Sequence, residues 1–223
     1  LYSRSVGSGL FCGHHWSASN FSKRILSQAK EIVEKEKNYF KKNDYRGIFG
    51  LDFVLDRHRE KLYLTECNPR LLGSMPTLTM VELLNQELPI IAFHLLEYLE
   101  IPYEIDPKKI NEILWQRKEG AQMCLHNPFQ REVIQIKELE AGAYKAKSQK
   151  LEFLRSGYAM GHLKDKSEFL LTEGLQKKGA KIQSYQRLGR ILTKKRVLNE
   201  DLKDLRPEVK NFLKLTLKSF DLK

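Results

Sequence analysis

The sequence has no run of apolar residues long enough to cross a lipid bilayer, which takes about 20 in a row. Its most apolar stretch, residues 88–99, is too short and contains His94 and Glu97. No secretory signal precedes the first predicted helix. These absences predict a cytoplasmic protein without a membrane partner.

Cysteine is also scarce in this chain. The three cysteines, Cys12, Cys67 and Cys124, are widely spaced and form no C-x-x-C pair. An odd number at this spacing argues against a disulfide framework and against a zinc site. The pattern agrees with a cytoplasmic location, and we interpret Cys67 as a small buried apolar side chain.

Acidic residues are few relative to basic ones, 28 against 39, which gives a net charge of +11. Residues 1–105 contain 13 basic and 13 acidic side chains, whereas residues 106–223 contain 26 basic and 15 acidic ones. The whole excess of positive charge thus lies in the second part of the chain. This shift predicts two domains, 1–105 and 106–223, with a boundary near Asp106 and Pro107.

The basic second part shows the pattern of a β-rich domain. Its apolar segments are short, often alternate with polar residues, and are separated by glycines such as Gly142, Gly157 and Gly174. Pro207 and the apolar residues after it predict a closing amphipathic helix that ends near Phe220. We expect most of the lysines to cover a solvated surface. Attraction of an anionic substrate is a second interpretation, and nucleic acid binding is disfavoured because no RNA or DNA motif accompanies the short basic runs.

The first part of the chain contains helical patterns. Residues 21–41 have apolar side chains at helical spacing, with Lys and Glu between them, and predict an amphipathic helix that Asn20 or Ser19 caps. Two further helices are expected over residues 77–85 and 88–99. Together with the strands described next, these helices predict the α+β class.

The most informative segment is residues 47–73, GIFGLDFVLDRHREKLYLTECNPRLLG. Two runs rich in apolar, aromatic and β-branched residues, joined by the charged segment DRHREK, predict a β-hairpin. A turn centred near Arg59 places Asp52 opposite Glu66, with Cβ atoms roughly 5 Å apart. Because side chains alternate along a strand, we expect Asn68 on the same face as Glu66.

The predicted face combines two opposed carboxylates with aliphatic side chains, Val54, Leu62 and Leu64. Apolar residues on the other face as well are typical of a covered sheet. Burial of like charges in such a sheet costs several kcal/mol unless a cation compensates them. Mg²⁺ is the expected ion, with Mn²⁺ as a substitute, because it prefers carboxylate and other oxygen ligands. Solvated carboxylates near Lys61 or Arg59 are the alternative interpretation.

The pattern G-L-D-F-V-L-D, a short turn and L-Y-L-T-E-C-N-P-R resembles the metal-binding end of the ATP-grasp superfamily, which includes biotin carboxylase, carbamoyl phosphate synthetase and D-alanine–D-alanine ligase. The resemblance implies that Asp52, Glu66 and Asn68 hold Mg²⁺ on the phosphates of ATP. It also implies that Asn68 and Arg70 contact the nucleotide. Arg70 is expected near the transferred phosphate, where its planar fork suits phosphate or carboxylate.

The same resemblance implies an ATP-dependent carboxylate–amine ligase, which activates a small-molecule carboxylate as an acyl phosphate for attack by an amine. The lid and much of the adenine site of this family come from sequence before this segment, and only residues 1–20 precede the first predicted helix. We therefore expect residues 1–105 to be the C-terminal part of a grasp domain, an antiparallel sheet with covering helices. A smaller, basic β-rich domain, 106–223, follows it. A non-catalytic scaffold whose basic part binds a partner or nucleic acid is the alternative function.

Two other motifs point less clearly to a site. The GHHW motif places His14 next to His15, and alternation along a strand would direct them to opposite faces. A shared metal ion is therefore not expected, and one histidine in a substrate contact is the alternative. The GSG tripeptide at residues 7–9 lacks the Walker spacing and its lysine, so we interpret it as a turn.

Overall fold

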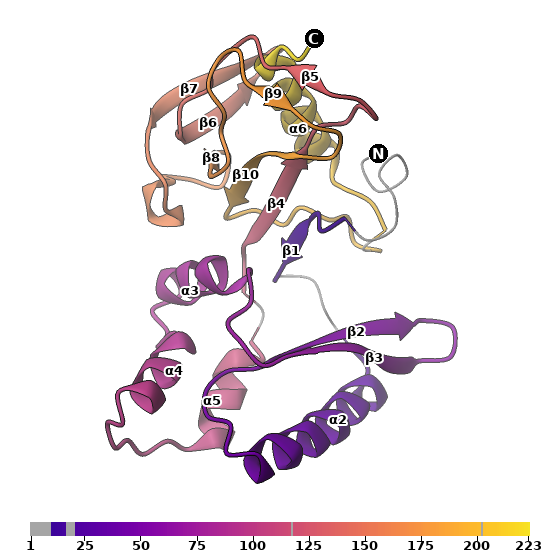
Figure 1. The fold of residues 1–223 in the computed structure, drawn as a ribbon, viewed down its shortest axis with the longest axis vertical. Coiled ribbons are helices and arrows are strands. Elements are labelled where there is room, and N and C mark those ends of the chain that lie inside the picture. Colours follow the sequence, from indigo (N-terminus) through magenta and orange to yellow (C-terminus); the bar gives the residue numbers. More distant parts are fainter. Residues whose placement is uncertain (1–9, 17–20, 117, 202) are drawn as a thin grey trace. The chain divides into compact units, whose positions relative to one another are not determined.

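The computed structural model (Figure 1) describes residues 10–16, 21–116, 118–201 and 203–223. It is a mixed helix and strand structure with antiparallel sheets, in agreement with the predicted class. The chain divides into two compact units. We call Ser19–Gln116 the hairpin unit, and Leu1–Ala18 together with Arg117–Lys223 the sheet unit. No helix in the described ranges combines the length and apolarity needed to span a membrane.

This division differs from the predicted boundary near residue 106. Helix α5 (Pro107–Leu114) still belongs to the hairpin unit, and Asp106 caps its start, where Oδ1 accepts from Lys108 N at 2.9 Å. The N-terminal residues join the sheet unit, since β1 (Gly13–His15) pairs with a strand of that unit. The β-rich unit is therefore the larger of the two, and not the smaller as predicted.

The hairpin unit begins with helix α2 (Lys23–Lys42), close to the predicted range. Ser22 caps this helix, and its hydroxyl accepts from Ile25 N at 3.3 Å. The predicted caps, Ser19 and Asn20, lie outside the described residues. Ile25 is the buried residue of α2, so the hairpin unit covers the apolar stripe of this helix only in part.

Helix α2 lies along the hairpin of β2 (Gly50–Asp56) and β3 (Lys61–Asn68), as Figure 1 shows. Gln28 of α2 connects the two elements. Its Nε2 donates to the Glu60 carbonyl at 2.8 Å, and its Oε1 accepts from Leu62 N at 3.1 Å. One amide side chain thus satisfies a backbone acceptor and a backbone donor where the turn enters β3.

Two short helices follow the hairpin, α3 (Met75–Leu84) and α4 (Ile91–Tyr98). The predicted start of the first helix at Thr77 is wrong, because Pro76 lies inside its first turn. Proline is tolerated there, since the N–H that it lacks has no partner within the helix. Helix α4 covers only the central part of its predicted range.

The sheet unit is built on a six-stranded antiparallel sheet in the order β1-β4-β10-β8-β6-β7. A second, two-stranded sheet pairs β5 with β9. The unit contains 25 basic and 13 acidic residues, against 14 and 15 in the hairpin unit, so it holds the whole charge excess. The remaining strands are β4 (Ala121–His126), β5 (Val133–Ile134), β6 (Gly142–Lys147), β7 (Lys150–Ser156), β8 (Phe169–Thr172), β9 (Lys181–Ile182) and β10 (Arg187–Thr193).

Helix α6 (Pro207–Phe220) closes the sheet unit, as predicted. Its Val209 and Phe212 are fully buried, and the Phe212 ring stacks on Phe169 of β8 with 3.8 Å between ring centroids. Further buried side chains of this core come from β4, β8 and β10: Met123, Leu125, Leu171 and Ile191. The apolar stripe of α6 is therefore core and not a binding surface.

Candidate functional site

The hairpin has the predicted register at the end where the candidate ligands lie. Asp52 is opposite Glu66, and Gly50 is opposite Asn68. Directly opposed residues in an antiparallel pair have Cβ atoms about 5 Å apart. The prediction that two carboxylates face each other across β2 and β3 is confirmed.

A register shift between Asp52 and Phe53 interrupts this pairing. Phe53 is opposite Leu64, so Thr65 is the extra residue of a β-bulge, and its hydroxyl donates to the Asp52 carbonyl at 2.9 Å. A bulge reverses the alternation of side chains beyond it. Leu64 is accordingly half-buried whereas Glu66 is exposed, and the prediction that they share one face is wrong.

The carboxylate-bearing face of the hairpin is open. Asp52 and Glu66 are exposed, and so are Val54 at 56% and Tyr63 at 40%. The predicted cover on both faces is wrong, because this sheet has two strands and α2 lies along one side of it. Because the carboxylates of Asp52 and Glu66 are exposed, their charges do not require a compensating cation. The metal prediction therefore depends on the positions of the oxygen atoms.

Asn68 is the buried member of the predicted ligand set, with 6% of its surface exposed. Its Nδ2 donates to Asp52 Oδ2 at 3.2 Å. Its Oδ1 accepts no hydrogen bond from the residues that the structure describes, so this oxygen is available to a ligand. The structure thus brings Asp52 and Asn68 together, with the amide nitrogen of Asn68 directed at the carboxylate.

Gly50 allows the loop after β3 to approach the hairpin. A Cβ atom at this position would lie 2.3 Å from Cδ1 of Leu72. Leu72 in turn leads into α3, since its carbonyl accepts from Met75 N at 3.0 Å. The small residue opposite Asn68 therefore fixes the course of the chain that follows the candidate ligands.

Arg70 begins this loop, and its side chain is exposed. Its backbone N donates to the Asn68 carbonyl at 2.8 Å, and its Nη1 donates to the Leu71 carbonyl at 3.3 Å. It forms no ion pair within the described part of the chain. Most of its guanidinium donors remain available to a phosphate or carboxylate.

The donor set fits a hard cation but does not complete its shell. No group of three or more His, Cys, Asp or Glu side chains among the described residues could hold a metal ion. Asp52, Glu66 and Asn68 would provide two carboxylates and one amide oxygen. Mg²⁺ commonly uses one or two carboxylates and takes its other ligands from water and phosphate. The site therefore fits a metal that arrives with a phosphate ligand better than a permanent structural metal.

The histidines of the GHHW motif lie in the sheet unit. His14 on β1 is opposite Gln122 of β4, and the His14 Nδ1 is 2.9 Å from the Gln122 Nε2. The neighbouring His15 is opposite Ala121. His14 therefore has a structural partner on the adjacent strand. The predicted turn at residues 7–9 lies outside the described residues.

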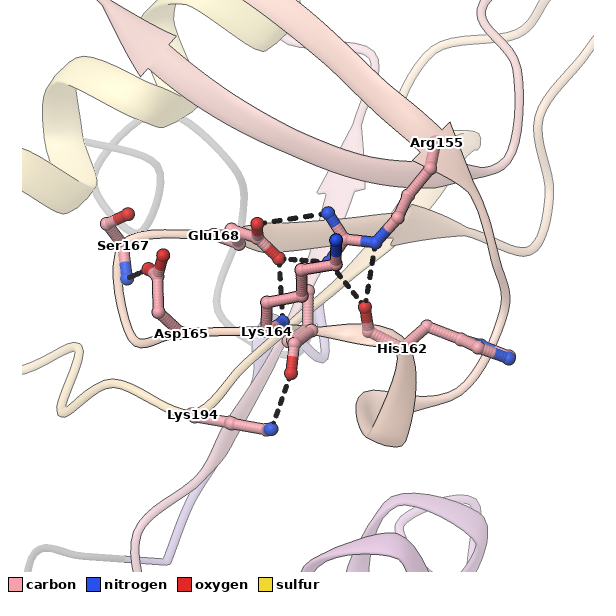
Figure 2. Close-up of polar contacts among 8 residues, drawn as sticks. Arg155, His162, Lys164, Asp165, Ser167, Glu168 and Lys194 are labelled. Carbon is pink, nitrogen blue, oxygen red and sulfur yellow. Dashed lines mark hydrogen bonds and ion pairs between the residues drawn. The ribbon is translucent and has the colours of Figure 1, made fainter.

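A polar cluster that the sequence did not reveal joins β7 to the segment before β8 (Figure 2). Arg155 Nη1 donates to Glu168 Oε1 at 3.0 Å, and its Nη2 donates to Oε2 of the same carboxylate. Arg155 Nε also donates to the His162 carbonyl at 3.1 Å. Glu168 is buried, and its Oε2 accepts from Lys164 N at 2.8 Å.

All these donors and acceptors are satisfied within the protein. A further link joins Lys194 Nζ of the segment after β10 to the Leu163 carbonyl at 2.6 Å. The hydrogen bonds with Arg155 lower the pKa of Glu168, so the carboxylate stays charged at neutral pH. The cluster thus anchors the loop at residues 157–168 and offers no free group for catalysis.

We expect Glu168→Gln to lower the free energy of unfolding by about 2 kcal/mol, because a bidentate charged hydrogen-bond pair is lost. Since folding lowers the pKa of Glu168, its contribution is complete above the unfolded pKa of about 4.3 and disappears as pH falls through the folded value. Urea unfolding between pH 7 and pH 3 measures both effects. Glu152→Gln, which removes a half-exposed ion pair with Lys147, should cost less than about 0.5 kcal/mol. Equal losses in the two variants would contradict the assignment.

No protein-family model and no curated protein matches this chain. The functional argument therefore starts from the arrangement of the hairpin residues.

Proposed function

We propose that this chain holds the Mg²⁺- and phosphate-binding part of an ATP-grasp ligase that joins a carboxylate to an amine. The opposed Asp52 and Glu66 pair, with the buried Asn68 amide bonded to Asp52, supports this proposal. The exposed Arg70 lies two residues after Asn68, at the start of the loop that follows β3, and most of its guanidinium donors are free. Two carboxylates, an amide oxygen and an arginine are the groups that a metal-bound triphosphate needs.

Each residue has a separate role in the proposed reaction. Asp52, Glu66 and Asn68 Oδ1 would hold Mg²⁺, which when bound neutralises charge on the phosphates of ATP. Arg70 would donate to the γ-phosphoryl oxygens as this group moves to the substrate carboxylate, which yields an acyl phosphate and ADP. The amine then attacks the acyl carbon and releases phosphate. These reaction steps require correctly placed substrates and charged groups rather than a side-chain nucleophile.

The charge of the sheet unit supports the same proposal. With 25 basic and 13 acidic residues, this unit attracts anions at long range. ATP and a carboxylate substrate are both anionic. Long-range attraction of this kind raises the local concentration of substrates and does not require a specific site.

We expect Glu66→Gln to weaken Mg²⁺-dependent binding of a non-hydrolysable ATP analogue by more than about 1 kcal/mol, because a charged metal ligand becomes a neutral one. Calorimetric titration with and without Mg²⁺ measures this effect. The titration is made on this chain and on a longer protein that contains it.

The matched control is Glu104→Gln, which removes the same charge from an exposed position of the hairpin unit outside the hairpin. This variant should bind as the unchanged chain does. If Glu66→Gln bound the ATP analogue with unchanged Mg²⁺-dependent affinity, the result would contradict the role of Glu66 as a metal ligand. Absence of Mg²⁺-dependent binding in both proteins would favour the scaffold function instead.

A further inference from the structure

Two of the three cysteines lie where β1 pairs with β4, two strands that are side by side in Figure 1. Cys12 directly precedes β1, and Cys124 belongs to β4. The register of these strands pairs Gly13 with Met123. It extends one residue further, because Cys124 N donates to the Cys12 carbonyl at 2.8 Å. Cys12 and Cys124 are therefore directly opposed, although they are far apart in the sequence.

The hydrogen bonds identify the type of this pair. Trp16 N donates to the Gly120 carbonyl at 3.1 Å, and Cys124 N donates to the Cys12 carbonyl, so both pairs are hydrogen-bonded positions of one antiparallel ladder. Opposed residues at such positions have Cα atoms about 5.5 Å apart and side chains on one face. A disulfide spans Cα separations of roughly 4.4–6.8 Å. The typical Cα spacing of such a pair thus lies within the range that a disulfide spans.

The two thiols differ in environment. Cys12 is exposed, and its Sγ donates to the Leu10 carbonyl at 3.3 Å. Cys124 is only 5% exposed, and this burial raises the pKa of its thiol, while Arg187 and Arg190 act in the opposite direction. An external reagent therefore reaches Cys12 first, and Cys124 is the thiol that reacts second.

We propose that Cys12 and Cys124 form a reversible disulfide, with a low-molecular-weight disulfide such as oxidised glutathione as the oxidant. The Cys12 thiolate attacks one sulfur of the reagent, forms a mixed disulfide and releases one reduced glutathione. The Cys124 thiolate then attacks the Cys12 sulfur and releases the second. One protein S–S bond replaces two S–H bonds, and both hydrogens and both electrons leave with the two glutathione thiols.

The bond would join the strand by which the chain leaves the sheet unit to the strand by which it returns. The loop closed in this way contains the complete hairpin unit, Ser19–Gln116. A cross-link that closes a long loop restricts the unfolded chain strongly. Oxidation is therefore expected to raise the unfolding temperature of the sheet unit. This modification does not depend on the proposed ligase activity.

The test is incubation of the folded chain with oxidised glutathione, followed by thiol counting and peptide mapping without reductant. The count of free thiols should fall from three to one. Cys67, in the other unit, should remain open to alkylation, and one cross-linked peptide should contain Cys12 and Cys124. A reductant should restore all three thiols.

Three variants make this result specific. Cys12→Ser should keep both remaining thiols reduced and show no rise in unfolding temperature. Cys124→Ala should stop at the mixed disulfide on Cys12, and Cys67→Ser should oxidise as the unchanged chain does. A cross-link that involves Cys67, or a stable glutathione adduct on Cys12 of the unchanged chain, would overturn the proposal.

Discussion

Phe212→Ala should destabilise the sheet unit by about 4 kcal/mol, the largest stability effect that we expect from a single substitution in this chain. The Phe212 ring is fully buried, and it stacks on Phe169 with 15° between the ring planes. Removal of the ring takes away apolar contacts and leaves a cavity between α6 and β8, which the neighbouring side chains fill only in part.

Urea unfolding followed by circular dichroism measures this loss. Phe129→Ala is the matched control, because Phe129 belongs to the same unit and is 42% exposed. We expect this control to cost less than about 1 kcal/mol, since surface substitutions have small effects. If Phe212→Ala remained as stable as the control variant, this result would contradict the packing of α6 on the sheet described here.

Arg70→Lys should lower the turnover of the ligase about 100-fold and change nucleotide affinity much less, a result that depends on the proposed function. The Arg70 guanidinium is exposed and free of ion pairs among the described residues. Lysine keeps the positive charge but lacks the planar fork that donates two parallel hydrogen bonds to a phosphate or carboxylate. An interaction that strengthens as charge develops affects the rate more than ground-state binding.

Phosphate release and calorimetric titration of the ATP analogue, both on the longer protein, separate these two quantities. Arg59→Lys is the control, because Arg59 lies at the turn of the same hairpin, with its side chain 77% exposed. This variant should keep both turnover and affinity. An equal loss of turnover and affinity in Arg70→Lys would instead make Arg70 a ground-state phosphate contact.

Local patterns predicted several elements of this fold correctly. The hairpin and its register at Asp52 and Glu66 followed from two β-rich runs around a short charged turn. Helix α6 followed from Pro207 and the apolar spacing after it. In each case the pattern lies within a few neighbouring residues, and the periodicity of one strand or helix determines which side chains share a face.

The bulge at Thr65 shows where such patterns stop. A single extra residue in β3 reverses the alternation of side chains. The sequence does not reveal it, because apolar residues occur on both faces of the predicted hairpin. The exposure of Asp52 and Glu66 was missed for a related reason. Burial depends on which elements cover a face, and apolar residues within the strands do not reveal that.

The Arg155 and Glu168 pair was missed because the two residues belong to different segments, and nothing in either segment identifies the other. The opposition of Cys12 and Cys124 was missed because it requires two chain segments of the sheet unit to pair although the hairpin unit separates them in the sequence.

The sequence by itself thus determined helices α2 and α6, the hairpin, the identity of the candidate ligands and the excess of positive charge, whereas it did not predict helix α5. The tertiary structure alone decided which carboxylates are exposed, where the units divide, and that β1 closes on β4. The physical reason is the range of the interactions. Backbone preference and side-chain periodicity act between neighbours, whereas burial and strand pairing depend on residues that only folding brings together.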